Sequence, residues 1–174
     1  MKKRALWLGL SFLLVAALVL TGCPASVEEE EEEVGVPILG IGETYQTPEV
    51  EVTVSEAIVT ESYEYYDQAS ESMATREADP GMSFLIVTAK TKNVSSALRR
   101  EGHGRFFVWT AEGVLKASGA YLGEDVFPGQ HGLSAGAKVE GTILFEIREG
   151  ARDLAISYSS TFGFYWPLVK WVIE

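Results

Sequence analysis

Cysteine, histidine and basic residues are scarce in this chain of 174 residues, and the scarcity excludes several classes of protein. There is one cysteine, which excludes both an internal disulfide framework and a metal site built from several cysteines. The 14 Lys and Arg are outnumbered by 25 Asp and Glu, so the net charge is −11. Because nucleic-acid binding depends on a cationic surface, we expect no nucleic-acid partner.

Long apolar runs are also lacking, since residues 5–20 form a run of only 16 residues. A helix that crosses a bilayer needs about 18 to 20. The run follows Lys2, Lys3 and Arg4 and precedes Thr21 and Gly22. This order, in which a basic segment is followed by an apolar segment and then by small residues, is typical of an export signal. We therefore expect residues 1–22 to be a signal peptide, with an uncleaved membrane anchor as the alternative.

The end of this signal carries the first motif, Leu20-Thr21-Gly22-Cys23. It resembles the lipobox of bacterial and archaeal lipoproteins. The resemblance implies that Cys23 is acylated, becomes the N-terminus of the mature protein, and attaches it to the extracytoplasmic face of the cell membrane. Stable anchoring needs more than one acyl chain, because each buried CH₂ contributes only about 0.8 kcal/mol. The alternative is that Cys23 is a free buried or reactive thiol.

An acidic segment follows the cysteine, with six consecutive glutamates at residues 28–33. Like charges repel one another and bury no apolar surface, so such a run stays solvated. We expect residues 23–41 to be a flexible tether and residues 42–174 to be the folded domain. From Cys23 to Gly40 the tether could reach about 60 Å. A cation-binding or partner-binding acidic patch is the alternative.

Most of the expected domain alternates apolar and polar residues with the period of two that is typical of strands. Short turns rich in glycine separate many of the strands. About seven short strands without helices between them predict an all-β fold, an immunoglobulin-like antiparallel β-sandwich. The clearest strands are residues 50–54, 85–89 and 139–147, and the others are residues 105–110, 114–117, 154–158 and 168–173.

Two stretches lack the strand pattern. Residues 63–76, rich in Glu, Ser, Tyr and Ala, are predicted to form a long loop or one short helix at the edge of the sandwich. Residues 117–134, which contain four glycines, are predicted to be a loop-rich connection between sheets. Loops at the ends of a sandwich are the expected place for binding.

Two segments of the domain carry a family resemblance: residues 80–87, in a strand that ends in Lys92-Asn93, and residues 133–147. They resemble the telokin-like, immunoglobulin-related domain of unknown function found on many prokaryotic lipoproteins and secreted proteins. In that family a Leu-x-x-Gly turn feeds a Gly-x-x-x-Phe strand before a Leu-x-x-x-Tyr strand, here residues 154–158. The resemblance implies an immunoglobulin-like sandwich in an extracytoplasmic location, and it implies no particular activity.

Catalytic and metal-binding motifs are weak. Residues 132–136 match G-x-S-x-G, the pattern of a serine nucleophile on a strand-to-helix turn, but a strand is expected after Ser134. His103 and His131, with Glu124 and Asp125, have no spacing typical of a zinc site. We therefore expect no catalytic residue, metal ligand or cofactor. The alternatives are a small envelope hydrolase that uses Ser134 with either histidine, and a metal-binding or solute-binding lipoprotein.

Aromatic residues give the best candidates for a recognition surface. Trp109 and Trp171 lie in expected strands, so we predict that they belong to the core. A cluster of tyrosines and a tryptophan before a proline are harder to bury, so the predicted recognition surface consists of Tyr63, Tyr65, Tyr66 and Trp166. The leading hypothesis is a non-enzymatic, lipid-anchored binding module that presents its domain to an envelope or extracellular protein partner.

The sequence also contains one N-glycosylation pattern, Asn93-Val94-Ser95. Because the lipobox is typical of prokaryotic proteins, glycosylation of Asn93 is an alternative and not the leading expectation.

Overall fold

The computed structural model describes residues 35–117, 125–162 and 166–173. The expected signal peptide, Cys23, the glutamate run and Glu124 lie outside the described residues. Among the residues that are described, no helix has the length and apolar character to cross a membrane.

Strands dominate the described part of the chain, which also holds one short 3-10 helix, η1, at His103–Arg105. All seven expected strands are present, although with extended or shifted ends. They are β3 (Val50–Thr60), β6 (Met82–Asn93), β8 (Phe106–Thr110), β9 (Gly113–Lys116), β11 (Lys138–Arg148), β12 (Ala155–Ser159) and β13 (Pro167–Val172). The other strands are β1 (Ile38–Gly40), β2 (Thr44–Gln46), β4 (Ser62–Asp67), β5 (Ser72–Glu77), β7 (Arg99–Glu101) and β10 (His131–Leu133).

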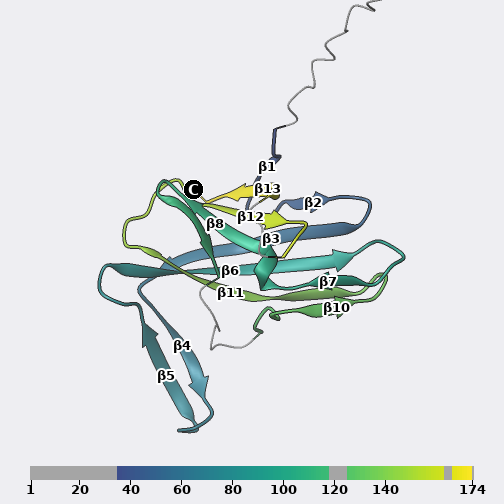
Figure 1. Cartoon of the computed structure of the whole chain (residues 1–174). Coiled ribbons are helices and arrows are strands. Elements are labelled where there is room, and N and C mark those ends of the chain that lie inside the picture. The colour runs from purple at the N-terminus through teal and green to yellow at the C-terminus, as the bar shows by residue number, and fades with distance from the viewer. Residues whose placement is uncertain (1–34, 118–124, 163–165, 174) are drawn as a thin grey trace, which may run out of the picture. The chain divides into compact units, whose positions relative to one another are not determined.

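Two sheets form a sandwich (Figure 1). One has the order β1-β13-β12-β8-β9 and the other β11-β6-β3-β2. All pairs within them are antiparallel except β1 with β13, which is parallel. The prediction of an all-β antiparallel sandwich is therefore confirmed, with 13 described strands instead of about seven.

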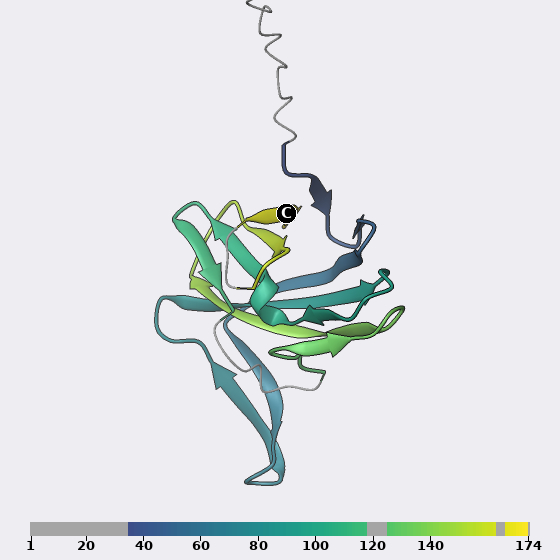
Figure 2. The same cartoon turned by 45° about the vertical axis from the view of Figure 1, so that its right-hand side comes forward.

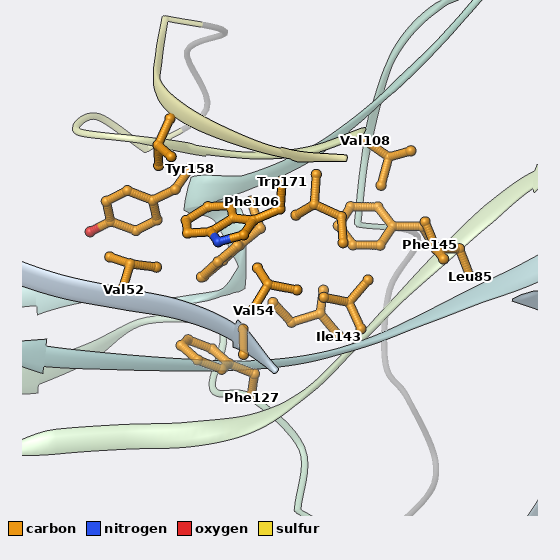
Figure 3. Packing of buried hydrophobic residues seen from close by; sticks show 14 of the residues in the cluster. Val52, Val54, Leu85, Phe106, Val108, Phe127, Ile143, Phe145, Tyr158 and Trp171 are labelled. Carbon is orange, nitrogen blue, oxygen red and sulfur yellow. The ribbon is translucent and has the colours of Figure 1, made fainter. Parts of the chain in front are cut away.

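The core lies between the two sheets, where their alternating apolar faces meet (Figure 3). Tyr158 and Trp171 project from one sheet toward Val52 and Val54 of the other. The Phe106 ring meets the Tyr158 ring edge-on, with centroids 5.3 Å apart. Edge-to-face aromatic pairs add about 0.5 to 1.5 kcal/mol beyond the burial of their area. The strand predictions were correct because one face of each strand packs here.

The domain begins earlier than expected. Residues 35–41 were predicted to belong to the tether, but β1 pairs with β13 in register, with Ile38 opposite Lys170. The Lys170 N–H also donates to the Pro37 carbonyl at 2.9 Å. Glycine and proline near the start of this segment hid a three-residue strand, which is too short to show an alternating pattern.

Residues 63–76 form neither a loop nor a helix but most of an antiparallel hairpin, β4 with β5. Both of its faces carry polar residues, so its sequence lacks the apolar alternation that reveals a strand with one face in the core. The expected loop at residues 117–134 also contains structure. Strand β10 pairs with β7, and Phe127 N–H donates to the Thr142 carbonyl of β11 at 2.9 Å.

The side chain of Asn93 is fully buried at the end of β6. Its amide donates to the carbonyls of Ala97 and Leu133 at 2.7 and 2.9 Å, and its oxygen accepts the Ser95 N–H at 3.0 Å. In the folded domain this side chain therefore organises the turn after β6 and is not accessible for glycosylation.

Candidate functional site

The β4–β5 hairpin extends away from the two sheets in both views of the molecule (Figures 1 and 2). Its root packs on the outer face of the four-stranded sheet. The Tyr63 ring lies edge-on to the Phe84 ring of β6, with centroids 5.2 Å apart, and both belong to a small buried cluster together with Leu144 of β11. Tyr63 is only 8% exposed. It therefore anchors the hairpin, and the prediction that it lies on a recognition surface is wrong.

Arg76 of β5 holds the same root from the other strand. Its guanidinium lies 3.2 Å from a Glu146 carboxylate oxygen, donates to the Tyr63 hydroxyl at 3.3 Å, and sits 5.3 Å from the centroid of the Phe84 ring. These contacts join the hairpin to β6 and β11. They fix the direction in which the hairpin leaves the sandwich.

The distal half of the hairpin is accessible. Tyr65 is half-buried, with its ring centroid 6.3 Å from that of Tyr63. Tyr66 and Met73 pair directly across the two strands, and they are 50% and 62% exposed. Directly paired residues of an antiparallel ladder share one face. The hairpin therefore presents a contiguous aromatic and thioether surface, which we call the Tyr66–Met73 face.

The turn at the tip is ordered by Asp67. Its carboxylate accepts the Ala69 N–H at 3.0 Å and the Ser70 hydroxyl at 2.7 Å. The hydrogen bond from Ser70, followed by that from Ala69, lowers the pKa of Asp67. Glu71 completes the turn at a φ of 50°. This closed turn keeps the two strands in register beside the Tyr66–Met73 face.

Trp166 lies at the other end of the sandwich. It is 78% exposed and comes directly before Pro167, which pairs with Ser159 at the end of β12. The hairpin instead leaves from the β3 and β6 ends at Thr60 and Met82. The four expected recognition residues thus do not form one surface: Tyr65 and Tyr66 stay on the hairpin, and Trp166 is separate.

The two strand tryptophans have different environments. Trp171 is fully buried, and its ring N–H donates to the Glu43 carbonyl at 2.9 Å. Trp109 is only half-buried, and Lys170 Nζ lies 3.9 Å from the centroid of one of its rings. The core prediction was therefore correct for Trp171 and wrong for Trp109, which faces outward beside a cation.

A buried charged cluster, which sequence reasoning missed, ties β7 and η1 to β12. The Glu101 carboxylate is fully buried and contacts two guanidinium groups, Arg99 Nε and Arg105 Nε, the second at 3.4 Å. It also accepts the Tyr158 hydroxyl at 2.9 Å. In the sequence, the only sign of this cluster is the presence of four charged residues within positions 99–105. Charged residues are ordinarily predicted to lie on the surface, so the sequence does not reveal that this group is buried.

The pKa values of two groups in this cluster, the Tyr158 hydroxyl and the Arg99 guanidinium, are set by burial together with the charges and hydrogen bonds around them. Burial, and then the Glu101 charge, raise the pKa of the Tyr158 hydroxyl. Burial by itself lowers the pKa of the Arg99 guanidinium, but the hydrogen bonds and charges of Tyr158 and Glu101 outweigh burial and raise it. The cluster therefore favours a neutral Tyr158 hydroxyl and a charged Arg99 guanidinium. Both carboxylate oxygens are occupied by protein donors, which makes the cluster a structural crosslink.

The G-x-S-x-G segment is a turn between two strands. Ser134 is exposed between β10 and β11, and its carbonyl accepts the Ala137 N–H at 3.0 Å. Among the described residues its hydroxyl forms no hydrogen bond with a histidine. His131 is exposed, whereas His103 Nδ1 is buried without a partner and burial lowers the pKa of His103. The described residues include no group of three side chains suited to a metal ion.

Comparisons with solved structures agree on the fold. The structure of ycdA, a candidate lipoprotein of Bacillus subtilis, matches with a TM-score of 0.55 at 16% identity over 75% of this chain and 38% of ycdA. This chain therefore spans well under half the length of ycdA. The yjhA protein of the same organism matches with a TM-score of 0.52 at 16% identity, over 78% of this chain and 98% of that one.

MPT63, a secreted protein of Mycobacterium tuberculosis, gives a TM-score of 0.54 at 14% identity, over 80% of this chain and 99% of its own. At these identities the likeness concerns the fold alone. No curated protein matches the sequence. A family model matches residues 39–165, most of the chain, and by that match the protein belongs to the family described as Domain of unknown function (DUF4352).

Proposed function

We propose that the protein is a lipid-anchored, extracytoplasmic binding module that presents the β4–β5 hairpin to a protein partner at the cell envelope. The observation that carries the proposal is the exposed Tyr66–Met73 face on a hairpin that extends from the sandwich. In this proposal the protein acts by binding and has no catalytic centre.

The structure of the hairpin supports a role in binding. Aromatic and methionine side chains are enriched at the centres of protein interfaces. The contacts of Tyr63 and Arg76 at the root and the Asp67 turn at the tip hold the hairpin in one conformation. A preorganised surface loses little conformational entropy when it binds, so more of the contact energy remains as affinity.

The anchor and spacer rest on the sequence before the domain. The lipobox at residues 20–23 would attach acyl chains to Cys23, and the glutamate run would keep the domain away from anionic headgroups. A candidate lipoprotein and a secreted protein share the fold, which supports this placement. In this proposal the single cysteine, Cys23, serves to attach the protein to the membrane and is not part of the folded domain.

Charge narrows the choice of partner. Residues 61–79 contain six acidic residues and one basic residue, Arg76, whose charge is paired with Glu146. An acidic hairpin repels phosphate backbones and anionic lipid surfaces, whereas it attracts cationic protein surfaces. We therefore propose a protein partner, and no nucleic acid.

The proposal can be tested by co-purification. The full chain, tagged at its C-terminus, is extracted from native envelope in detergent as wild type, as the double variant Tyr66→Ala/Met73→Ala, and as Leu98→Ala. Leu98 is 72% exposed and lies on the segment before β7, so its variant is a matched control for lost apolar surface. The wild type and Leu98→Ala should retain one common protein that the double variant loses.

Retention of the same protein by the double variant would contradict the proposal. Because the changed side chains are exposed, thermal unfolding of all three proteins should be alike, within about 0.5 kcal/mol. Loss of binding by a folded double variant can then be assigned to the surface.

A further inference from the structure

A second surface lies where β3 has an unpaired edge. Strand β2 covers only the first half of β3, with Gln46 opposite Glu51 and Thr44 opposite Thr53. On the N-terminal side of β2, Gly42 N–H donates to the Val54 carbonyl of β3 at 2.8 Å, and the segment before it, β1, pairs in the other sheet. Within the described residues no strand pairs with residues 55–60 on the side opposite β6. Unpaired edges of this kind are templates for strand addition.

The register shows which backbone groups are available at this edge. A bulge between Val54 and Glu56 inserts one residue, after which Glu56 pairs with Thr88 of β6. Thr142 of β11, opposite Thr88, directs its N–H and carbonyl away from β6, to Asp125 and Phe127.

Because the backbone direction alternates along an antiparallel strand, Thr88 directs its own groups toward β3, and Glu56 directs its groups toward β6. Ala57 and Val59 consequently direct their N–H and carbonyl groups outward.

An apolar groove of about 770 Å³ runs beside this edge. It lies between the half of β3 that β2 leaves open and the edge strand β1 of the other sheet. Ile58 and Val59 are 46% and 49% exposed. An added strand would direct alternate side chains into the groove. Its wall includes Leu39, Ile41, Ala57 and Ile173.

The charge of the surroundings favours one kind of occupant. Glu56 and Glu61 lie on or next to the edge, and residues 55–61 contain no basic residue. The domain from residue 35 onward carries 19 acidic and 11 basic residues, so a second copy would be repelled. A cationic segment is complementary to the edge.

We propose that residues 55–60 of β3 accept an extended, cationic segment of a partner protein as an added strand, with its apolar side chains in the groove beside β1. Backbone hydrogen bonds would supply affinity and the groove would select the alternate side chains, as in other cases of β-augmentation. This site is separate from the Tyr66–Met73 face, so neither proposal depends on the other.

The test measures amide hydrogen exchange of the full chain in detergent, with NMR as the readout. The probe is a capped hexapeptide of alternating valine and lysine. The two control peptides are a copy in which the lysines are replaced by glutamates and a copy with N-methylated valines, which cannot donate its valine N–H groups. The probe should slow exchange at the amides of Ala57 and Val59 at least tenfold at millimolar concentration, and the controls should not.

Two variants separate backbone pairing from side-chain contact. Val59→Pro removes an outward N–H that the β3–β6 ladder does not use. In this variant the probe should no longer slow exchange at the Ala57 amide. Val59→Thr keeps that N–H and should retain protection, so the test remains decisive if the proline variant fails to fold.

Three results would overturn the proposal. They are absence of protection by the probe, equal protection by the N-methylated peptide, and protection that rises with protein concentration without any peptide. The last result would mean that a second copy covers the edge.

Discussion

Removal of the buried Glu101 carboxylate should destabilise the domain severely. In the variant Glu101→Gln the shape is kept, but the guanidinium groups of Arg99 and Arg105, whose side chains are only 13% and 8% exposed, lose their shared counter-charge. Arg99 keeps the Glu49 carboxylate at 2.9 Å, so the guanidinium that loses its carboxylate is that of Arg105. Breaking a buried ion pair by removing one partner costs about 3 to 5 kcal/mol, because a charge remains buried without compensation. At a slope of about 2 kcal/mol per molar urea, the unfolding midpoint should fall by about 1.5 to 2.5 M.

Urea denaturation followed by tryptophan fluorescence measures this loss, with Glu112→Gln as the matched control. Glu112 lies 3.1 Å from Arg148 Nε, and both side chains are mostly exposed. Surface pairs contribute about 0 to 1 kcal/mol, so the control should unfold close to the wild type. If Glu101→Gln lowered the midpoint no more than Glu112→Gln does, the interpretation of this cluster as the crosslink between β7, η1 and β12 would be wrong.

Three further changes have defined outcomes. Asn93→Ala should lower the free energy of unfolding by about 1 to 3 kcal/mol in urea titrations, because the buried Leu133 carbonyl loses the donor that the Asn93 amide supplies; a loss below 0.5 kcal/mol would contradict this role. Gly141→Ala should cost about 1 to 3 kcal/mol, since its Cβ would lie 2.6 Å from the Asp125 carbonyl oxygen, whereas Gly35→Ala has open space and should be neutral; equal stability of the two would refute the argument. Burial lowers the pKa of His103, so the folded state takes up its proton less readily than the unfolded state. The wild type should therefore lose stability relative to His103→Gln as the pH falls below about 6.5, and parallel stability curves between pH 7.5 and 5 would contradict the assignment.

Most of the sandwich could be predicted from the sequence because burial on one face leaves a period of two. Apart from Leu144, the neighbours of Ile143 and Phe145 in β11 are polar, and this alternation marks the strand; both side chains are indeed buried. The β4–β5 hairpin could not be predicted in this way. Its strands leave the core, so their two faces are chemically alike, and their register is fixed by Arg76 and the Asp67 turn.

The candidate site was predicted in part. The sequence predicts that the tyrosine cluster is hard to bury, and Tyr66 is indeed exposed. The burial of Tyr63 depends on Phe84, which lies 21 positions later in the chain. The local sequence pattern does not show which face of the sheet Phe84 occupies. The separation of Trp166 from the hairpin likewise follows from the strand order, which a period of two does not reveal.

The central claim, that the hairpin is the surface through which this module binds its partner, is tested most directly by photo-crosslinking in the native envelope. A photoreactive phenylalanine analogue is placed at Tyr66 in one full-length protein and at Leu98 in another, two exposed positions at different ends of the sandwich. One discrete crosslinked protein is expected from position 66, and none of that mass from position 98. No crosslink at position 66, or the same product from both positions, would contradict it.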